Sequence, residues 1–128
     1  MRLFDDLFGR NDSMKSTLNL TWNYLEDTDL NQIDAISFEK PVVLFKHSTR
    51  CIISKMALKE FEKEHKIPNE AMELYFLDLL NHRPLSNHVA EHYSIAHQSP
   101  QILVIREGKC IYHNSHDGIN ANHLKAFI

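Results

Sequence analysis

Three short apolar runs constrain the fold of this chain more than any other feature of its sequence. They lie at residues 41–45, 72–80 and 101–106, and the first, PVVLF, is rich in β-branched residues, as buried strands are. Two segments in which apolar residues follow helical spacing, 49–65 and 85–95, separate them. Strands that alternate with helices in this way predict an α/β domain.

The segments on either side complete the predicted order. We expect a strand within 18–25, a helix over 28–38, and a hairpin over 101–114 that turns at residues 107–109. A short helix at 120–128 closes the chain. This order predicts a thioredoxin-like α/β fold, in which helices flank a central mixed sheet, and the hairpin disfavours the main alternative, a small flavodoxin-like sheet.

We divide the chain into an N-terminal extension, residues 1–17, and a thioredoxin-like domain, residues 18–128.

Composition and charge limit the partners and the location that we expect for the protein. The 14 basic and 17 acidic residues give a net charge of −3, which argues against a nucleic-acid partner. No apolar run approaches the roughly 20 residues that cross a bilayer, and Asp5 and Asp6 stand where a secretory signal needs apolar residues. We therefore expect a cytoplasmic protein without a membrane partner.

The pattern also predicts which helical residues meet the sheet. In the helix over 49–65, the predicted core-facing residues are Ile52, Ile53, Met56, Ala57 and Phe61. In the helix over 85–95, Ser86 is the expected N-terminal cap.

A cysteine lies at the seam between a strand and a helix. Cys51 is expected at or just inside the first turn of the helix that follows the first apolar run. Unpaired backbone N–H groups point outward there, and the helix dipole places about half a positive charge nearby. Arg50 adjoins the cysteine, Lys55 lies one turn further on, and His47 can approach from the strand end. These surroundings favour a thiolate, which is the nucleophile in disulfide exchange.

Ser54 follows Cys51 by three residues, so the sequence has Cys-x-x-Ser in place of Cys-x-x-Cys. A serine cannot resolve a mixed disulfide, but its hydroxyl can donate a hydrogen bond to a thiolate. A monothiol protein must pass its mixed disulfide to an outside thiol, which predicts a low-molecular-weight thiol as partner. The alternative is that Cys51 is an inert small residue and Ser54 an ordinary first-turn serine.

Pro100 stands immediately before the third apolar run. In thioredoxin-like proteins a cis-proline occupies this place beside the active cysteine, and the backbone of the preceding residue, here Ser99, pairs with the substrate main chain. We therefore predict a cis Ser99–Pro100 bond and a substrate-binding role for both residues. The alternative is a trans-proline that begins a strand.

The stretches FKHSTRCIIS (45–54) and GKCIYHNSHDGI (108–119), with Pro100 between them, resemble the monothiol bacilliredoxin family. Members have a thioredoxin-like fold and a Lys-His-Ser-Thr-x-Cys-Pro-Ile-Ser motif, and the resemblance covers about residues 18–128. The positions that match the motif are Lys46, His47, Ser48, Thr49, Cys51, Ile53 and Ser54.

The resemblance implies a reaction. Cys51 would attack a mixed disulfide between bacillithiol and a protein, free the protein thiol and take up bacillithiol, and a second bacillithiol would regenerate Cys51. Cys51 and Ser54 are then the catalytic residues, and His47, Thr49 and Arg50 stabilise the thiolate. The partners are bacillithiolated proteins and bacillithiol, a thiol co-substrate rather than a bound cofactor. Ile52 stands where the family has proline, so it keeps a backbone N–H that proline lacks.

The remaining cysteine and the histidines support no second site. Cys110 could resolve a Cys51 disulfide only if the two Cα atoms lay within about 7 Å, and we expect it to be a packed strand thiol. Zinc needs three or four converging ligands, whereas the histidines form two separate pairs, so we predict no metal site. The pairs are His88 with His92 and His113 with His116.

Three other functions stay open at this point. The chain could be a redox-silent thioredoxin-like binding module that holds partners near Pro100, or a metal carrier or sensor built on its histidines. It could also bind an iron–sulfur cluster by analogy with monothiol glutaredoxins, although no glutaredoxin glycine pair is evident.

Overall fold

The structure, a computed structural model, describes residues 21–25 and 30–128. Its first half contains β1 (Trp22–Tyr24), α1 (Leu30–Ser37), β2 (Val42–His47), α2 (Ile52–Glu64) and β3 (Glu73–Asp78). Its second half contains α3 (Arg83–Tyr93), β4 (Gln101–Arg106), β5 (Lys109–Ser115) and the 3₁₀ helices η2 (His116–Gly118) and η3 (Ala121–Phe127). The predicted order of strands and helices is confirmed, and the predicted extension over residues 1–17 lies outside the described residues.

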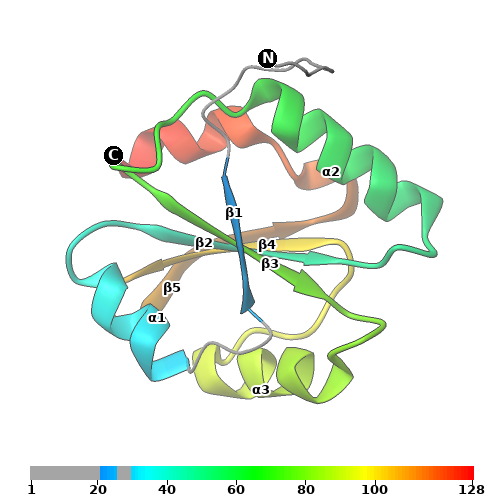
Figure 1. Ribbon diagram of the computed structural model, residues 1–128, viewed down its shortest axis with the longest axis horizontal. Coiled ribbons are helices and arrows are strands. Elements are labelled where there is room, and N and C mark those ends of the chain that lie inside the picture. Colours follow the sequence, from blue (N-terminus) through cyan, green and yellow to red (C-terminus); the bar gives the residue numbers. More distant parts are fainter. Residues whose placement is uncertain (1–20, 26–29) are drawn as a thin grey trace, which may run out of the picture.

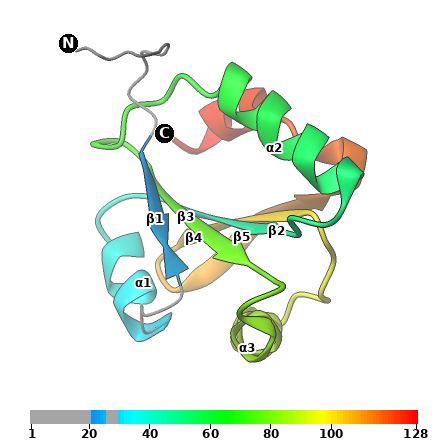
Figure 2. The ribbon, with the colours of Figure 1, turned by 45° about the vertical axis from the view of Figure 1, so that its right-hand side comes forward.

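The strands form one five-stranded mixed sheet in the order β1-β3-β2-β4-β5. β3 pairs in parallel with both β1 and β2, whereas β4 runs antiparallel to β2 and to β5. In Figure 1 the sheet crosses the middle of the molecule, with α2 and η3 above it and α1 and α3 below it. Figure 2 shows the same two helical layers from another side. This is the predicted α/β arrangement.

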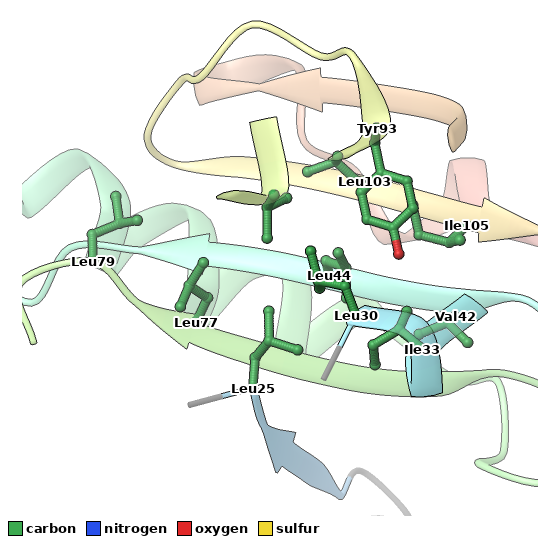
Figure 3. Packing of buried hydrophobic residues seen from close by; sticks show 11 residues of the cluster. Leu25, Leu30, Ile33, Val42, Leu44, Leu77, Leu79, Tyr93, Leu103 and Ile105 are labelled. Atoms are coloured by element: carbon green, nitrogen blue, oxygen red, sulfur yellow. The ribbon is translucent and has the colours of Figure 1, made fainter. Parts of the chain in front are cut away.

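β2 lies at the centre of the sheet, and all six of its residues are buried. Its side chains alternate between two cores because successive strand residues point to opposite faces. Val42 and Leu44 belong to the core beneath α1 and α3, which Figure 3 shows. Val43 and Phe45 belong to the core beneath α2 and η3. The apolar run 41–45 therefore predicts β2 correctly, although the strand continues two residues further through polar side chains.

The predicted apolar face of α2 is wrong in its first half. Ile52, Ile53 and Met56 were expected to face the sheet, but their side chains are 69%, 56% and 68% exposed. The buried residues of α2 are Ser54 and Phe61. Helical spacing accounts for the difference, since positions 54 and 61 lie seven residues apart on one face and the first of them is polar.

Two expected helix ends also differ. α3 begins at Arg83, its N-cap is His82, and Pro84 occupies the first turn. Ser86 is therefore not the cap but a buried residue inside the helix. The final helix is a 3₁₀ helix whose N-cap is Asn120, and the side chain of Asn120 accepts a hydrogen bond from the Asn122 N–H.

We expect the stability of the fold to decrease as the pH falls from 7 to 5. Burial lowers the pKa values of His47, His65 and His97 below the ordinary value of 6.5. The unfolded chain consequently binds more protons than the folded chain below about pH 6.5, so stability is present above this pH and is lost below it. Urea denaturation at a series of pH values measures the effect. His65→Phe should weaken the pH dependence, and Asn87→Ala, a change at an exposed residue that does not titrate, should not; equal slopes in all three proteins would contradict the account.

Candidate active site

Cys51 is the N-cap of α2, and its side chain is half-buried. A tight turn precedes it, because the Cys51 N–H donates to the Ser48 carbonyl at 3.1 Å. The first intrahelical bond joins the Lys55 N–H to the Cys51 carbonyl at 3.0 Å. The side chain of Cys51 makes no capping hydrogen bond. Cys51 therefore lies at the predicted start of the helix, where the first-turn N–H groups lack intrahelical acceptors and the helix dipole has its positive end.

A buried hydrogen bond between His47 and Ser54 fixes this helix start. Ser54 Oγ lies 2.8 Å from His47 Nδ1, and it also accepts the Ser48 N–H at 3.0 Å. Both side chains are buried. The carbonyl of His47 accepts the Leu79 N–H at 3.0 Å, so β3 is tied to the same point. The end of β2, the turn and the first turn of α2 therefore form one hydrogen-bonded unit around Cys51.

These contacts differ from those that the sequence suggests for Ser54. Its hydroxyl has one proton, which was expected to be donated to the Cys51 sulfur. When His47 carries its proton on the other ring nitrogen, Ser54 donates to His47 Nδ1 and has no proton left for the sulfur. A direct bond from Ser54 to the thiolate therefore requires a proton on His47 Nδ1.

Of the other residues predicted to stabilise the thiolate, Thr49 and Arg50 lie exposed in the turn beside Cys51. His47 faces the α2 side of the sheet, since it follows the alternation of Val43 and Phe45, and burial lowers its pKa. All three residues lie between β2 and α2, as the sequence indicates. The side chain of His47, however, forms a hydrogen bond with Ser54.

The Ser99–Pro100 peptide bond is cis, as predicted. Lys46 of β2 pairs with Gln101 of β4, so Pro100 lies at the end of the sheet where β2 leads into the Cys51 turn. Figure 1 shows the loop before β4 and the loop after β2 at the same end. The Pro100 carbonyl accepts the His116 N–H at 3.1 Å, and the hydroxyl of Ser99 is buried without a hydrogen-bond partner among the described residues. Cys51, Ser99 and Pro100 therefore lie at one end of the sheet.

An exposed apolar surface borders this end. It consists of Ile52, Ile53 and Met56, the same residues that were expected in the core. Beside it, a groove of about 620 Å³ runs along α2 from Ile53 to Lys63 and is closed on its other side by η2. An apolar surface beside a nucleophile offers a contact area for a partner.

A second polar cluster, which sequence reasoning missed, lies on the opposite face of the sheet. Lys46 is fully buried, and its ammonium group donates to His97 Nδ1 at 3.3 Å. The Ser86 hydroxyl lies 3.1 Å from the same nitrogen. Burial lowers the pKa of Lys46 to about 8. The sequence signal was a lysine that directly follows a buried apolar run, which is an unusual position for this residue.

Cys110 lies far from Cys51 along the sheet. It pairs with Ile105, which pairs with Val42 at the first residue of β2, whereas Cys51 follows the last residue of β2. At about 3.3 Å per residue, the length of β2 separates the two by roughly 16 Å, well beyond disulfide range. The Cys110 thiol donates to the Tyr112 carbonyl at 3.3 Å, and burial raises its pKa. Both cysteines are free, and Cys110 is a packed strand thiol, as predicted.

The part of the chain that the structure describes has neither a metal-binding cluster nor a membrane-spanning helix. Residues 21–25 and 30–128 contain no group of three or more His, Cys, Asp or Glu side chains placed to hold a metal ion. None of the helices within these residues is long and apolar enough to cross a membrane.

Solved structures identify the class of the fold. One, described as a candidate oxidoreductase with a thioredoxin fold, is 28% identical, with a TM-score of 0.67, and covers 82% of this chain and 91% of its own. Thioredoxin from Malassezia sympodialis is 19% identical, with a TM-score of 0.59, and covers 80% of this chain and 84% of its own. Spinach chloroplast thioredoxin f is 18% identical, with a TM-score of 0.59, and covers 82% and 88%. The chain is a thioredoxin-fold protein.

The family follows from the sequence. The family model Monothiol bacilliredoxin BrxC matches residues 24–124, which is most of the chain. The protein belongs to the monothiol bacilliredoxin family, and its family and fold support a role as a thiol oxidoreductase.

We expect Ser54→Ala to destabilise the protein. The change leaves His47 Nδ1 and the Ser48 N–H without their buried partner, which costs about 1–3 kcal/mol of unfolding free energy. Urea denaturation measures this loss. The exposed Asn87 provides a control, since Asn87→Ala should change stability by no more than about 0.5 kcal/mol. A Ser54→Ala protein as stable as the wild type would show that the bond does not hold the helix start.

Proposed function

We propose that this protein is a monothiol thiol–disulfide oxidoreductase that removes bacillithiol from protein mixed disulfides through Cys51. The observation that carries the proposal is the placement of Cys51: it caps α2, and the other described thiol lies along the sheet beyond disulfide reach. A thiol in this position can form a mixed disulfide but has no internal partner to resolve it. Membership of the bacilliredoxin family supports bacillithiol as the outside thiol.

The proposed reaction has two exchange steps. In the first, the Cys51 thiolate attacks the bacillithiol sulfur of a protein–bacillithiol disulfide. A Cys51–bacillithiol bond forms, the original S–S bond breaks, and the protein sulfur leaves as a thiolate that takes a proton from water. In the second step, the thiolate of a free bacillithiol attacks the bacillithiol sulfur on Cys51. Cys51 leaves as a thiolate, and the two bacillithiols depart as their disulfide. Over both steps the protein sulfur is reduced to a thiol and the one free bacillithiol is oxidised, while the transferred bacillithiol stays in a disulfide throughout.

The first turn of α2 supplies the electrostatic part of this reaction. The backbone N–H groups of Ile52 and Ile53 lie in the first turn, directly after the N-cap Cys51. An anionic Cys51 sulfur would accept hydrogen bonds from such groups. Ile52 contributes an N–H that the proline of the family motif lacks. The cations of Arg50 and Lys55, both exposed nearby, add to this potential.

The cis-proline segment supplies the substrate contact. The backbone of Ser99 would pair with the main chain of the bacillithiolated protein and bring its disulfide to Cys51, with Pro100 holding the backbone in place. The exposed Ile52, Ile53 and Met56 would then contact the apolar side chains of that protein.

The test is the intact mass of the protein after exposure to oxidised bacillithiol, measured on the wild type, Cys51→Ser and Cys110→Ser. We expect one bacillithiol adduct on the wild type and on Cys110→Ser, none on Cys51→Ser, and removal of the adduct by excess free bacillithiol. An internal disulfide that needs both cysteines would replace the monothiol cycle with a dithiol one. If native Cys51 forms no adduct while the denatured chain reacts freely, the protein is a redox-silent binding module instead.

A further inference from the structure

The stability of the fold does not by itself explain why the ammonium group of Lys46 is buried. Lys46 is fully buried, and His97 Nδ1 is its hydrogen-bond partner among the described residues. Removing an ammonium group from water is costly, and a buried apolar side chain of similar length is often neutral or stabilising by comparison. Because an apolar side chain could fill this position without that cost, the buried lysine points to a role besides stability.

The contacts of His97 show what Lys46 holds. An ammonium group can only donate, so His97 Nδ1 is the acceptor, and the Lys46 ammonium group and the Ser86 hydroxyl share its single lone pair. His97 lies two residues before Ser99, in the segment 94–100 that joins α3 to β4. Lys46 and Ser86 therefore tie this segment to the end of β2 and to the first half of α3.

The position of Lys46 in β2 connects this tie with the nucleophile. Lys46 and His47 are consecutive, so their side chains leave β2 on opposite faces. His47 binds Ser54 at the start of α2, beside Cys51, and Lys46 binds His97 in the segment that carries Ser99. The last two residues of one buried strand therefore hold the nucleophile and the proposed substrate-binding segment.

We propose that Lys46 and His97 form a positioning pair that sets the place of Ser99 and Pro100 relative to Cys51, and thereby the affinity for disulfide substrates rather than the reactivity of Cys51. This role rests on the proposed function, since the pair acts through the substrate-binding segment. Gln101 supports the same segment from β4: its Nε2 donates to the Ala96 carbonyl at 3.0 Å, and its Oε1 accepts the Gln98 N–H at 3.3 Å. The side chain of His97 forms the hydrogen bond between this segment and β2.

The experiment compares Lys46→Met, which keeps an unbranched side chain but removes the amine, with Lys66→Met, the same change at an exposed lysine. Its first measurement is hydrogen exchange of peptides that cover residues 94–100, which needs no substrate. Lys46→Met should exchange faster there by about tenfold, as expected for the loss of one hydrogen bond to a charged group. Exchange over residues 48–55 should stay unchanged, and Lys66→Met should match the wild type throughout.

The second measurement is turnover of a mixed disulfide between bacillithiol and a test peptide. Lys46→Met should raise KM about tenfold and change kcat by no more than about twofold. Alkylation of Cys51 by iodoacetamide should stay within about twofold of the wild-type rate, because its helix start is intact. His97→Leu removes the other partner and should have the same effect, and the double variant should be no worse than either single one.

The outcomes separate the two proposals. If the wild type does not turn over the bacillithiol disulfide, the proposed function fails, and hydrogen exchange still decides whether Lys46 holds residues 94–100. Unchanged exchange in Lys46→Met and His97→Leu would overturn the positioning pair. So would additive KM effects in the double variant, or a loss of iodoacetamide reactivity as large as the loss of turnover. If Lys46→Met does not fold, His97→Leu, at a half-buried site, gives the same readouts.

Discussion

The hydrogen bond between His47 and Ser54 is the contact on which the arrangement of the site depends. It joins the last residue of the central strand to the first turn of the helix that follows, across the turn that presents Cys51. Neither side chain reaches solvent, so the bond is not weakened by competition with water. The position of the sulfur at the N-cap, and with it the electrostatic support of the helix start, follows from this contact.

The end of β2 also contacts the segment that carries Ser99. β2 is buried on both faces, and a strand in this position ordinarily consists of apolar residues. Here it ends in a lysine and a histidine, and each binds an element that carries a proposed functional group. The site is therefore built on the central strand, whose last two side chains make polar contacts with the segments that carry Cys51 and Ser99. Cys110 is level with the opposite end of β2, so the proposed exchange assigns it no part.

Much of this could be predicted from the sequence, and the failures have physical reasons. The short apolar runs and the helical segments between them predict the order of the elements because each has a clear period. The core face of α2 was misjudged because its buried stripe starts with Ser54, and a polar residue in a core position hides the stripe from a hydrophobicity pattern. Ser86 resembles a helix cap in the sequence because its hydrogen-bond partner, His97, lies beyond the end of α3 and cannot be identified from the local pattern. The contact of Lys46 with His97 joins residues 51 positions apart, which no local pattern reveals.

The central claim is that Cys51 alone accepts bacillithiol from a protein. The most direct test is a single-turnover transfer from a bacillithiolated test protein to an excess of this protein without free bacillithiol, followed by the intact masses of both. The account predicts that the test protein loses one bacillithiol and that the wild type and Cys110→Ser gain it at equal rates, with the label on Cys51. Transfer that stops in Cys110→Ser, or a bacillithiol that stays on the test protein while the Cys51 thiol is free, would contradict it.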